Sequence, residues 1–154
     1  MKTIYVDTSV LGGKFDEEFE LWTDLFFKKV VSSELKLIIS DVAKEELHNA
    51  PQRVKDFVSS LPEKNQIITE LTEEAVLLAE RYLDEKVVGK SSRTGCYHIA
   101  IATILKADIL VSWNFKHIVN VQRIHGSNAV NLLNGYQTIE IRTPRETFNY
   151  ENND

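Results

Sequence analysis

The sequence predicts an α/β protein, a three-layer α/β/α sandwich around a mainly parallel sheet of about five strands. Short apolar runs rich in β-branched residues alternate with longer amphipathic segments along the whole chain. Such alternation is typical of strands joined by right-handed helical crossovers, which produce a parallel sheet covered on both faces. No repeats, low-complexity tracts or linkers interrupt the pattern.

The strand predictions rest on five short apolar runs. The first covers residues 3–9, in which an apolar stretch is followed by Asp7 and two hydroxyl residues. Gly12 and Gly13 come soon after it. The others cover residues 35–39, 66–69, 108–112 and 138–142. Continuous apolar runs bounded by turn residues are typical of buried parallel strands.

The helix predictions rest on apolar residues that recur at three- and four-residue spacing. They cover residues 16–33, 42–49, 51–61, 72–85, 96–106 and 119–133. The 96–106 segment is apolar almost throughout, so we expect it to be buried on most sides, and the polar stretch 86–94 to be a loop. Residues 1–144 are expected to form one domain, followed by a short polar tail at 145–154.

Composition favours a cytoplasmic globular protein. The 154 residues include 43% hydrophobic and 27% charged residues, which is ordinary for a soluble domain. The single cysteine, Cys96, excludes an internal disulfide framework. No apolar run approaches the roughly 18 residues that a membrane span needs, and the first residues lack the pattern of a signal peptide. A membrane partner is therefore not expected.

The net charge of −5 conceals an uneven distribution. Residues 86–125 carry six Lys and Arg against one acid, Asp108, whereas the rest of the chain carries 12 bases against 22 acids. The six bases are Lys86, Lys90, Arg93, Lys106, Lys116 and Arg123. Two interpretations stay open: these side chains form a phosphate-binding rim, or they are separate solvated charges.

Two carboxylates are expected at one edge of the sheet. Asp7 ends the first strand, and ligands of open α/β sheets sit outside the carboxyl ends of strands. Alternatively, Asp7 caps the following helix. Glu46 lies in the helix after the second strand, whereas the adjacent Glu45 would point about 100° away. Oxygen ligands suit Mg²⁺ or Mn²⁺, which can activate water and offset charge on a phosphodiester.

The motifs occur in an order and spacing that resemble the PIN-domain proteins, and most of all the VapC-like toxins of toxin–antitoxin operons. They are Val6-Asp7-Thr8-Ser9-Val10-Leu11, Ile39-Ser40 with Glu45-Glu46-Leu47, Tyr97-His98-Ile99-Ala100-Ile101-Ala102, and Ile109-Leu110-Val111-Ser112-Trp113-Asn114-Phe115. Single motifs are weak indicators, but the ordered set covers nearly the whole chain. The stretch from Gly135 to Pro144 also resembles one subgroup of this family.

The resemblance implies a PIN-like fold and a Mg²⁺- or Mn²⁺-dependent endoribonuclease, a toxin neutralised by a cognate antitoxin and forming a homodimer. In this family Asp7 matches the first acid and Glu46 the second, so these two would hold the metal. Thr8 and Ser9 match the hydroxyls that follow the first acid. With Lys90, Arg93, His98 and Lys116 they are the candidate substrate-binding residues.

Two positions depart from the family pattern. Gly95 stands where the third acid is expected, and Asn114 stands at the fourth, more variable position. The cluster would then carry a charge of about −2 rather than −4, which lowers its affinity for a divalent ion. His98 shares a helix face with Gly95 and is interpreted either as a satisfied structural histidine or as a phosphate contact or base.

Three functions are therefore compared. The first is a metal-dependent ribonuclease. The second is a degenerate PIN domain with weak or no nuclease activity that acts by binding RNA or protein, which Gly95 favours. The third is a phosphoaspartyl protein, which needs another acid beside the nucleophilic aspartate or two residues after it. Ser9 occupies the latter place, so this function is disfavoured.

Overall fold

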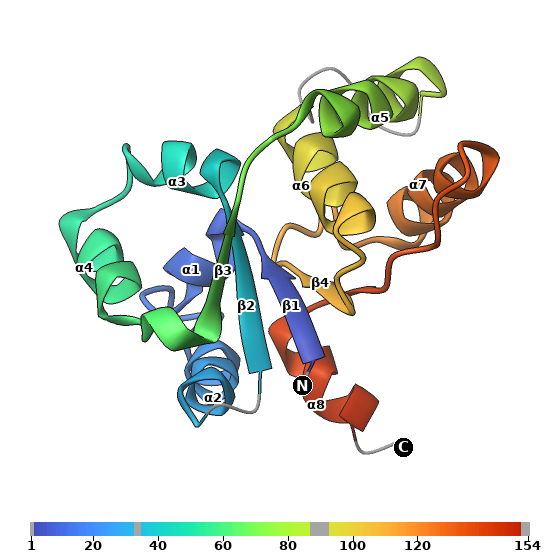
Figure 1. Ribbon diagram of the computed structural model, residues 1–154. Coiled ribbons are helices and arrows are strands. Elements are labelled where there is room, and N and C mark those ends of the chain that lie inside the picture. The colour runs from blue at the N-terminus through green and yellow to red at the C-terminus, as the bar shows by residue number, and fades with distance from the viewer. Residues whose placement is uncertain (1, 33–34, 87–92, 152–154) are drawn as a thin grey trace.

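The computed structural model describes residues 2–32, 35–86 and 93–151, and its centre is a parallel sheet (Figure 1). The strands are β1 (Lys2–Val6), β2 (Leu35–Ser40), β3 (Gln66–Thr69), β4 (Ile109–Val111) and β5 (Ile141–Arg142). They pair in the order β3-β2-β1-β4-β5. Every pairing is parallel, and Tyr5 in the central strand lies opposite Ile38 on one side and Leu110 on the other.

Helices cover both faces of the sheet (Figure 1). They are α1 (Thr8–Gly13), α2 (Glu20–Val31), α3 (Asp41–Leu47), α4 (Gln52–Ser60), α5 (Glu73–Asp84), α6 (Arg93–Ile104), α7 (Val121–Leu133) and α8 (Pro144–Glu151), with a short 3₁₀ helix, η1 (Glu63–Asn65). The hydrophobic core is divided accordingly: α5, α6 and α7 contribute to one cluster, and α1 to α4 with α8 to the other. The predicted three-layer α/β/α sandwich is confirmed.

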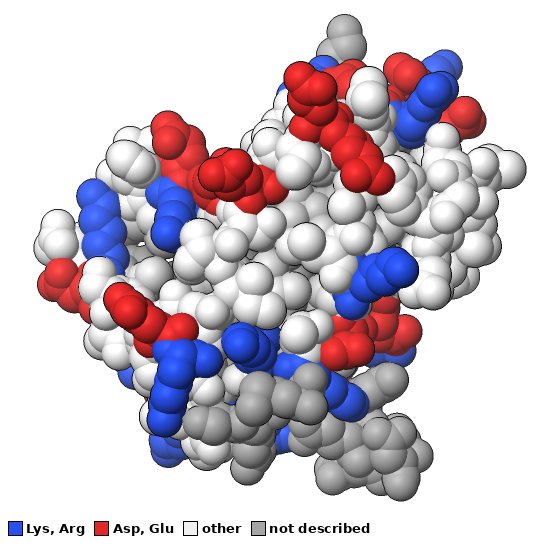
Figure 2. Space-filling view, in the orientation of Figure 1, with Lys and Arg blue, Asp and Glu red and all other residues white. Residues whose placement is uncertain are grey.

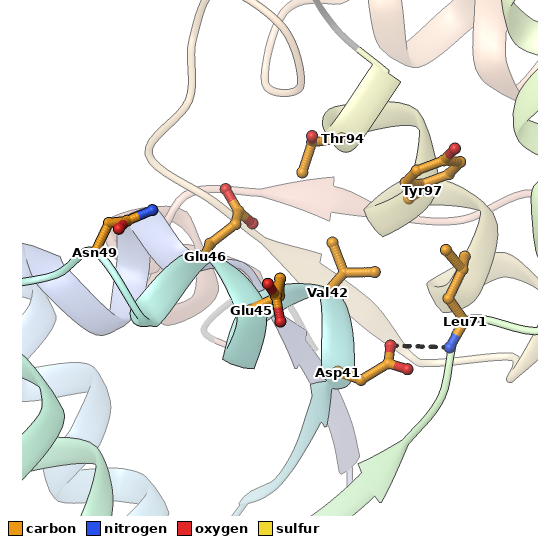
Figure 3. A pocket seen from close by; sticks show the side chains of 8 residues that line it. All are labelled: Asp41, Val42, Glu45, Glu46, Asn49, Leu71, Thr94 and Tyr97. Atoms are coloured by element: carbon orange, nitrogen blue, oxygen red, sulfur yellow. Dashed lines mark hydrogen bonds between the residues drawn. The ribbon is translucent and has the colours of Figure 1, made fainter.

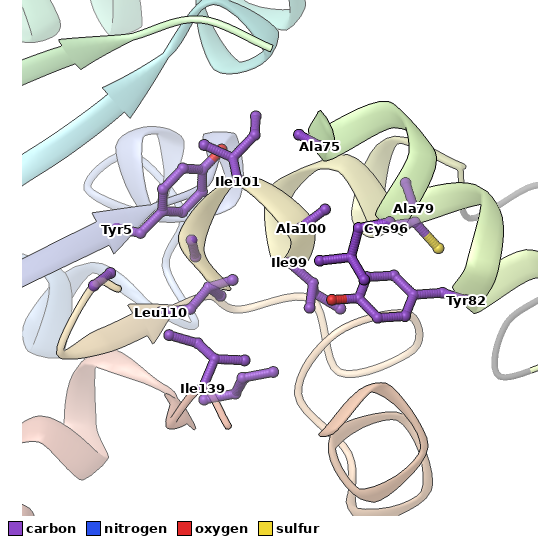
Figure 4. Packing of buried hydrophobic residues seen from close by; sticks show 14 of the residues in the cluster. Tyr5, Ala75, Ala79, Tyr82, Cys96, Ile99, Ala100, Ile101, Leu110 and Ile139 are labelled. Carbon is purple, nitrogen blue, oxygen red and sulfur yellow. The ribbon is translucent and has the colours of Figure 1, made fainter. Parts of the chain in front are cut away.

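The central strand shows how its sequence serves both layers. Side chains of a strand alternate between faces, so Tyr5 belongs to the cluster around α6 while Ile4 and Val6 belong to the opposite one. All three are at most 1% exposed. Figure 4 shows Tyr5 reaching from β1 toward α6, whose residues Ile99, Ala100 and Ile101 are also buried. The expectation that α6 is buried on most sides is confirmed.

Several boundaries differ from the sequence prediction, among them the start of α2, which is Glu20 rather than residue 16. The first strand ends at Val6 rather than continuing to Ser9, because Asp7 caps α1 through a bond from the Val10 amide. Helix α6 begins at Arg93, three residues before the predicted start. The last strand is only Ile141–Arg142, although the Leu110 amide also donates to the Glu140 carbonyl at 2.8 Å.

The stretch that was expected to be a polar C-terminal tail forms helix α8 over Pro144–Glu151. The Glu146 amide donates to Thr143 Oγ1 at 3.2 Å, and the Thr143 amide donates to Glu146 Oε1 at 3.1 Å. This reciprocal pair is a capping box, and proline suits the first helical position that it occupies here. Helix α8 packs on α2, where Phe148 lies 5.7 Å from Trp22 between ring centroids. None of the helices within the described residues is long and apolar enough to cross a membrane.

Candidate active site

A cavity of about 150 Å³ lies at the carboxyl edge of the sheet. Its walls come from the residues after β1, from α3, from the start of α6 and from the loop after β4. The lining residues are Asp7, Thr8, Ser9, Glu46, Thr94, Gly95, His98, Asn114, His117 and Ile118. The topology therefore brings together both predicted carboxylates and the two positions that depart from the family pattern.

Asp7 is a buried carboxylate held by hydroxyl groups. It is 3% exposed. Ser9 Oγ donates to Asp7 Oδ1 at 2.6 Å, as does the Val10 amide at 3.3 Å, and Ser112 Oγ donates to Oδ2 at 2.6 Å. Burial raises the pKa of Asp7 above its usual value, against the opposing effects of His98 and the hydroxyl bonds. The capping interpretation of Asp7 is confirmed, and the residue also lines the cavity.

Glu46 faces the same cavity from α3, and its side chain is 39% exposed. Its Oε1 accepts from Thr8 Oγ1 at 2.9 Å and pairs with His98 Nε2 at 2.7 Å. Burial raises the pKa of Glu46, but the hydrogen bonds from His98 and Thr8 outweigh it, so the pKa is lowered overall. Glu45 does not line this cavity, as expected because adjacent side chains of a helix point in different directions. It lies 3.9 Å from His48 instead.

His98 is buried, and both of its ring nitrogens are hydrogen-bonded. Nε2 bonds Glu46, and Nδ1 lies 2.6 Å from the Tyr5 hydroxyl, which in turn lies 2.7 Å from Ser40 Oγ. The interpretation as a satisfied histidine is confirmed. Its partner at Nε2 is nevertheless a carboxylate of the cavity, so the residue has more than a packing role.

Gly95 is the third residue of α6 and is buried against the loop after β4. A Cβ added there would lie 3.5 Å from Ile118 Cγ1 and 3.7 Å from His117 Cβ, which are ordinary van der Waals distances. The site therefore has room for a side chain at the position of the missing third acid. Asn114 lines the cavity, and its Oδ1 accepts from the His117 amide at 2.9 Å.

None of the predicted basic residues that the structure describes lines the cavity. Arg93 pairs with Glu80 of α5, and Lys116 lies in the loop beyond Asn114. Lys106 follows α6 and lies two residues before Asp108. The Asp108 carboxylate accepts from the Thr3 amide at the start of β1. Lys106 therefore lies at the edge of the sheet opposite the cavity. Lys90 falls outside the described residues. Among the residues that the structure describes, those that line the cavity include no Lys or Arg.

A wider groove of about 570 Å³ adjoins the cavity (Figure 3). Both are lined by Glu46 and Thr94, and the groove also by Asp41, Glu45, Asn49, Val42, Leu71 and Tyr97. In Figure 3 the Glu46 carboxylate points from α3 toward Thr94 at the start of α6. Figure 2 shows acidic side chains gathered over α3 and α5 on this face. The surroundings of the site are therefore more acidic than the sequence distribution predicted.

Several site residues were missed by sequence reasoning. Ser112 was expected only as the end of a strand, and Tyr5 only as a core residue. The signal for Ser112 was its position at the carboxyl end of β4, because β4 pairs directly with β1 and so ends beside Asp7. Thr94 and His117 gave no such signal, because the chain folds them onto the cavity from loops and a helix start.

The donor set fits a divalent ion that is held partly by water and substrate. Across residues 2–32, 35–86 and 93–151, no group of three or more His, Cys, Asp or Glu is placed to hold a metal. Mg²⁺ however commonly takes only one or two protein carboxylates and completes its shell with waters and phosphate oxygens. Asp7 and Glu46 each have their orientation fixed by neighbouring donors, as metal-binding carboxylates do. A cation would also offset the unfavourable burial of the Asp7 charge.

No model of a known protein family matches the chain, and no curated protein matches it. Solved structures do match. VapBC2 from Rickettsia felis, bound to a DNA fragment from its promoter, matches with a TM-score of 0.58 at 9% identity, over 92% of this chain and 98% of that one. FitAcB from Neisseria gonorrhoeae gives 0.57 at 10% identity, over 92% and 97%. DNA-bound VapBC from Salmonella typhimurium gives 0.55 at 15% identity, over 94% and 99%. The chain thus has a VapC-like, PIN-like fold.

Proposed function

We propose that this chain is a VapC-like endoribonuclease of the PIN type that depends on Mg²⁺ or Mn²⁺ and is neutralised by a cognate antitoxin. The observation that carries the proposal is the meeting of Asp7 and Glu46 in one cavity at the carboxyl edge of the sheet. VapBC2 and VapBC are both described as bound to DNA, and the likeness of this chain to these structures supports an antitoxin partner. A homodimer remains part of the proposal by resemblance.

Asp7 and Glu46 would hold the ion between them. When bound, it would activate water and neutralise charge that develops on the phosphodiester. The protein's own contribution is to fix the two carboxylates: Ser9, Ser112 and the Val10 amide orient Asp7, and Thr8 and His98 orient Glu46. Such preorganisation reduces the rearrangement needed when substrate phosphate enters.

RNA would reach the cavity past its outer residues. Lys116 follows the cavity residue Asn114 by two positions, and Arg93 directly precedes Thr94. These two, with Lys90, are the proposed phosphate contacts, and Thr8 and Ser9 are proposed to lie near the substrate. Because each neutralised phosphate releases counterions, RNA binding is expected to weaken steeply between about 50 and 200 mM salt.

A second function is favoured by Gly95. Two carboxylates bind a divalent ion more weakly than a larger acidic set does, and the described residues that line the cavity beside Gly95 include no third acid. A domain of this kind would bind RNA or an antitoxin while cleaving poorly. The two functions differ in one measurable quantity, the rate of RNA cleavage by the natural sequence.

The test measures cleavage of a structured RNA, once with about 1–10 mM Mn²⁺ and once with excess chelator. This order-of-magnitude Mn²⁺ concentration is chosen to exceed the dissociation constant of a site with few carboxylates. The nuclease proposal expects cleavage that requires the ion and is lost in both Asp7→Asn and Glu46→Gln. Asp108→Asn is the matched control, because Asp108 lies at the opposite edge. Cleavage that survives chelator or both site variants would refute the assignment. RNA binding without cleavage would establish the second function.

A further inference from the structure

We propose that Tyr5 and His98 are positioning residues: a buried hydrogen-bonded relay from Ser40 through Tyr5 holds the His98 ring at Nδ1, and His98 Nε2 then orients Glu46 in the cavity. Its consequence for metal binding rests on the function proposed above. The relay itself rests only on the arrangement of four side chains from four different elements, β2, β1, α6 and α3.

The relay is continuous and closed to solvent until it reaches Glu46. Ser40 and Tyr5 are 0% exposed, and His98 is 2% exposed. Successive links measure 2.7 Å from Ser40 Oγ to the Tyr5 hydroxyl, 2.6 Å from that hydroxyl to His98 Nδ1, and 2.7 Å from His98 Nε2 to Glu46 Oε1. The Tyr5 and His98 rings also meet edge to face, with centroids 5.6 Å apart.

The direction of the hydrogen bonds follows from the two ends of the relay. An ionised carboxylate only accepts, so His98 Nε2 must carry the proton that is donated to Glu46. In a neutral imidazole Nδ1 then carries no proton, so it accepts a hydrogen bond from the Tyr5 hydroxyl. Tyr5 oxygen in turn accepts from Ser40, whose Oγ accepts from the Ala43 amide at 3.2 Å. Every donor is used once.

The relay also joins the orientation of Glu46 to the start of the helix that carries it. Ser40 is the N-cap of α3, and Glu46 lies in the same helix. One hydroxyl therefore helps to begin α3 and anchors the relay that returns to its last turn. A phenylalanine at position 5 would fill the same core space, but it would leave Nδ1 without its donor. Glu46 would still require the proton on Nε2, so the ring would keep its tautomer and lose the contact that fixes its orientation.

The first test is the ¹⁵N chemical shifts of the histidine rings in the intact natural chain at neutral pH without metal. We expect the neutral Nε2–H tautomer at His98, which is assigned by its loss in His98→Gln. Tyr5→Phe should keep this tautomer but move the Nδ1 signal, because Nδ1 loses its hydrogen bond from the hydroxyl. Tyr82→Phe is the matched control, because Tyr82 is also 0% exposed but bonds Asn131 instead. An Nδ1–H tautomer or an imidazolium in the natural chain overturns the proposal, with no variant needed.

The second test is Mn²⁺ affinity, measured by the paramagnetic resonance signal of the free ion. We expect Tyr5→Phe to weaken binding by about tenfold, the lower end of what loss of an orienting partner does, and Tyr82→Phe to leave it unchanged. The same pair is compared in the Gly95→Asp background. Equal affinity of Tyr5→Phe and the natural chain refutes the positioning role. If no protein binds Mn²⁺, the proposed function fails at its metal site, while the tautomer measurement still decides whether the relay exists.

Discussion

Ser112 Oγ donates a hydrogen bond of 2.6 Å to Asp7 Oδ2, although the two residues are 105 positions apart. The bond exists because β4 pairs in parallel with β1, so both strands end at the same place. Ser112 is itself fixed by the Asn114 amide, which donates to its Oγ at 2.9 Å. The loop after β4 thereby helps to set the position of the most buried acid of the site.

Replacing Ser112 by alanine should destabilise the protein. Asp7 Oδ2 would lose its hydroxyl donor inside the protein, and a buried polar group left without its partner costs about 1–3 kcal/mol. Urea unfolding at neutral pH measures the change, with Ser60→Ala as control because its hydroxyl is exposed and bonds only Phe57 O. A loss no larger in Ser112→Ala than in Ser60→Ala would contradict the prediction.

Asp7→Asn should make the metal-free protein more stable at neutral pH. Burial raises the pKa of Asp7, so the folded state binds a proton that the unfolded chain releases above about pH 3.9. The natural protein therefore loses stability as pH rises through this window, by at most about 1.4 kcal/mol per pH unit for one proton. The asparagine variant lacks this loss, and its amide can still bond both serines.

The check is the free energy of unfolding of both proteins from pH 4 upward in chelator, a window that starts near the ordinary aspartate pKa. The advantage of Asp7→Asn should grow with pH. A constant difference, or one that favours the natural protein more at higher pH, would show that the pKa of Asp7 is not raised.

Glu46 should show the opposite sign. Its pKa is lowered in the folded state, where burial is outweighed by His98 and Thr8. Its ionised form therefore contributes stability above the ordinary glutamate pKa of about 4.3, and this contribution disappears as pH falls through the folded-state pKa. Because the side chain is 39% exposed, solvent screening limits the effect to about 0.5 kcal/mol.

Parallel unfolding curves of the natural chain and Glu46→Gln test this. The natural chain should gain relative to the variant between acidic and neutral pH, and Glu45→Gln, whose side chain is 84% exposed, is the matched control. Identical pH dependence of Glu46→Gln and Glu45→Gln would mean that the pairing with His98 does not hold Glu46.

The sequence allowed the placement of Asp7 and Glu46 at one edge, because strand ends in a parallel sheet are fixed by topology. The hydrogen-bond partners of the two acids, by contrast, depend on which elements the fold places beside them: Ser112 after β4 bonds Asp7, and His98 of α6 bonds Glu46. Ser112 and Tyr5 look like ordinary strand residues until the order β2-β1-β4 is known. Helix α8 was missed for a local reason, since Thr143, Pro144 and Glu146 form a recognisable capping signal that the polar composition concealed.

Gly95→Asp provides the most direct test of the incomplete acidic set. The added Cβ meets only van der Waals contacts, the nearest at 3.5 Å, and the carboxylate would stand in the first turn of α6, where the helix dipole favours an anion. Without metal, however, it would face Asp7 and Glu46 across the cavity, and three like charges repel. We therefore expect Gly95→Asp to be less stable than the isosteric Gly95→Asn in chelator at neutral pH.

Mn²⁺ should reverse that order. A third oxygen donor raises affinity for a hard cation, and an ion that binds only the folded state stabilises it by about 2.7 kcal/mol at 100 times its dissociation constant. Melting temperatures of Gly95→Asp and Gly95→Asn with and without Mn²⁺ make the comparison. Gly95→Ala separates the backbone effect, which is about 0.5–1 kcal/mol inside a helix. RNA cleavage should rise in Gly95→Asp and disappear again when Asp7→Asn is added. Equal stabilisation by Mn²⁺ of the aspartate and asparagine variants would place the third ligand elsewhere.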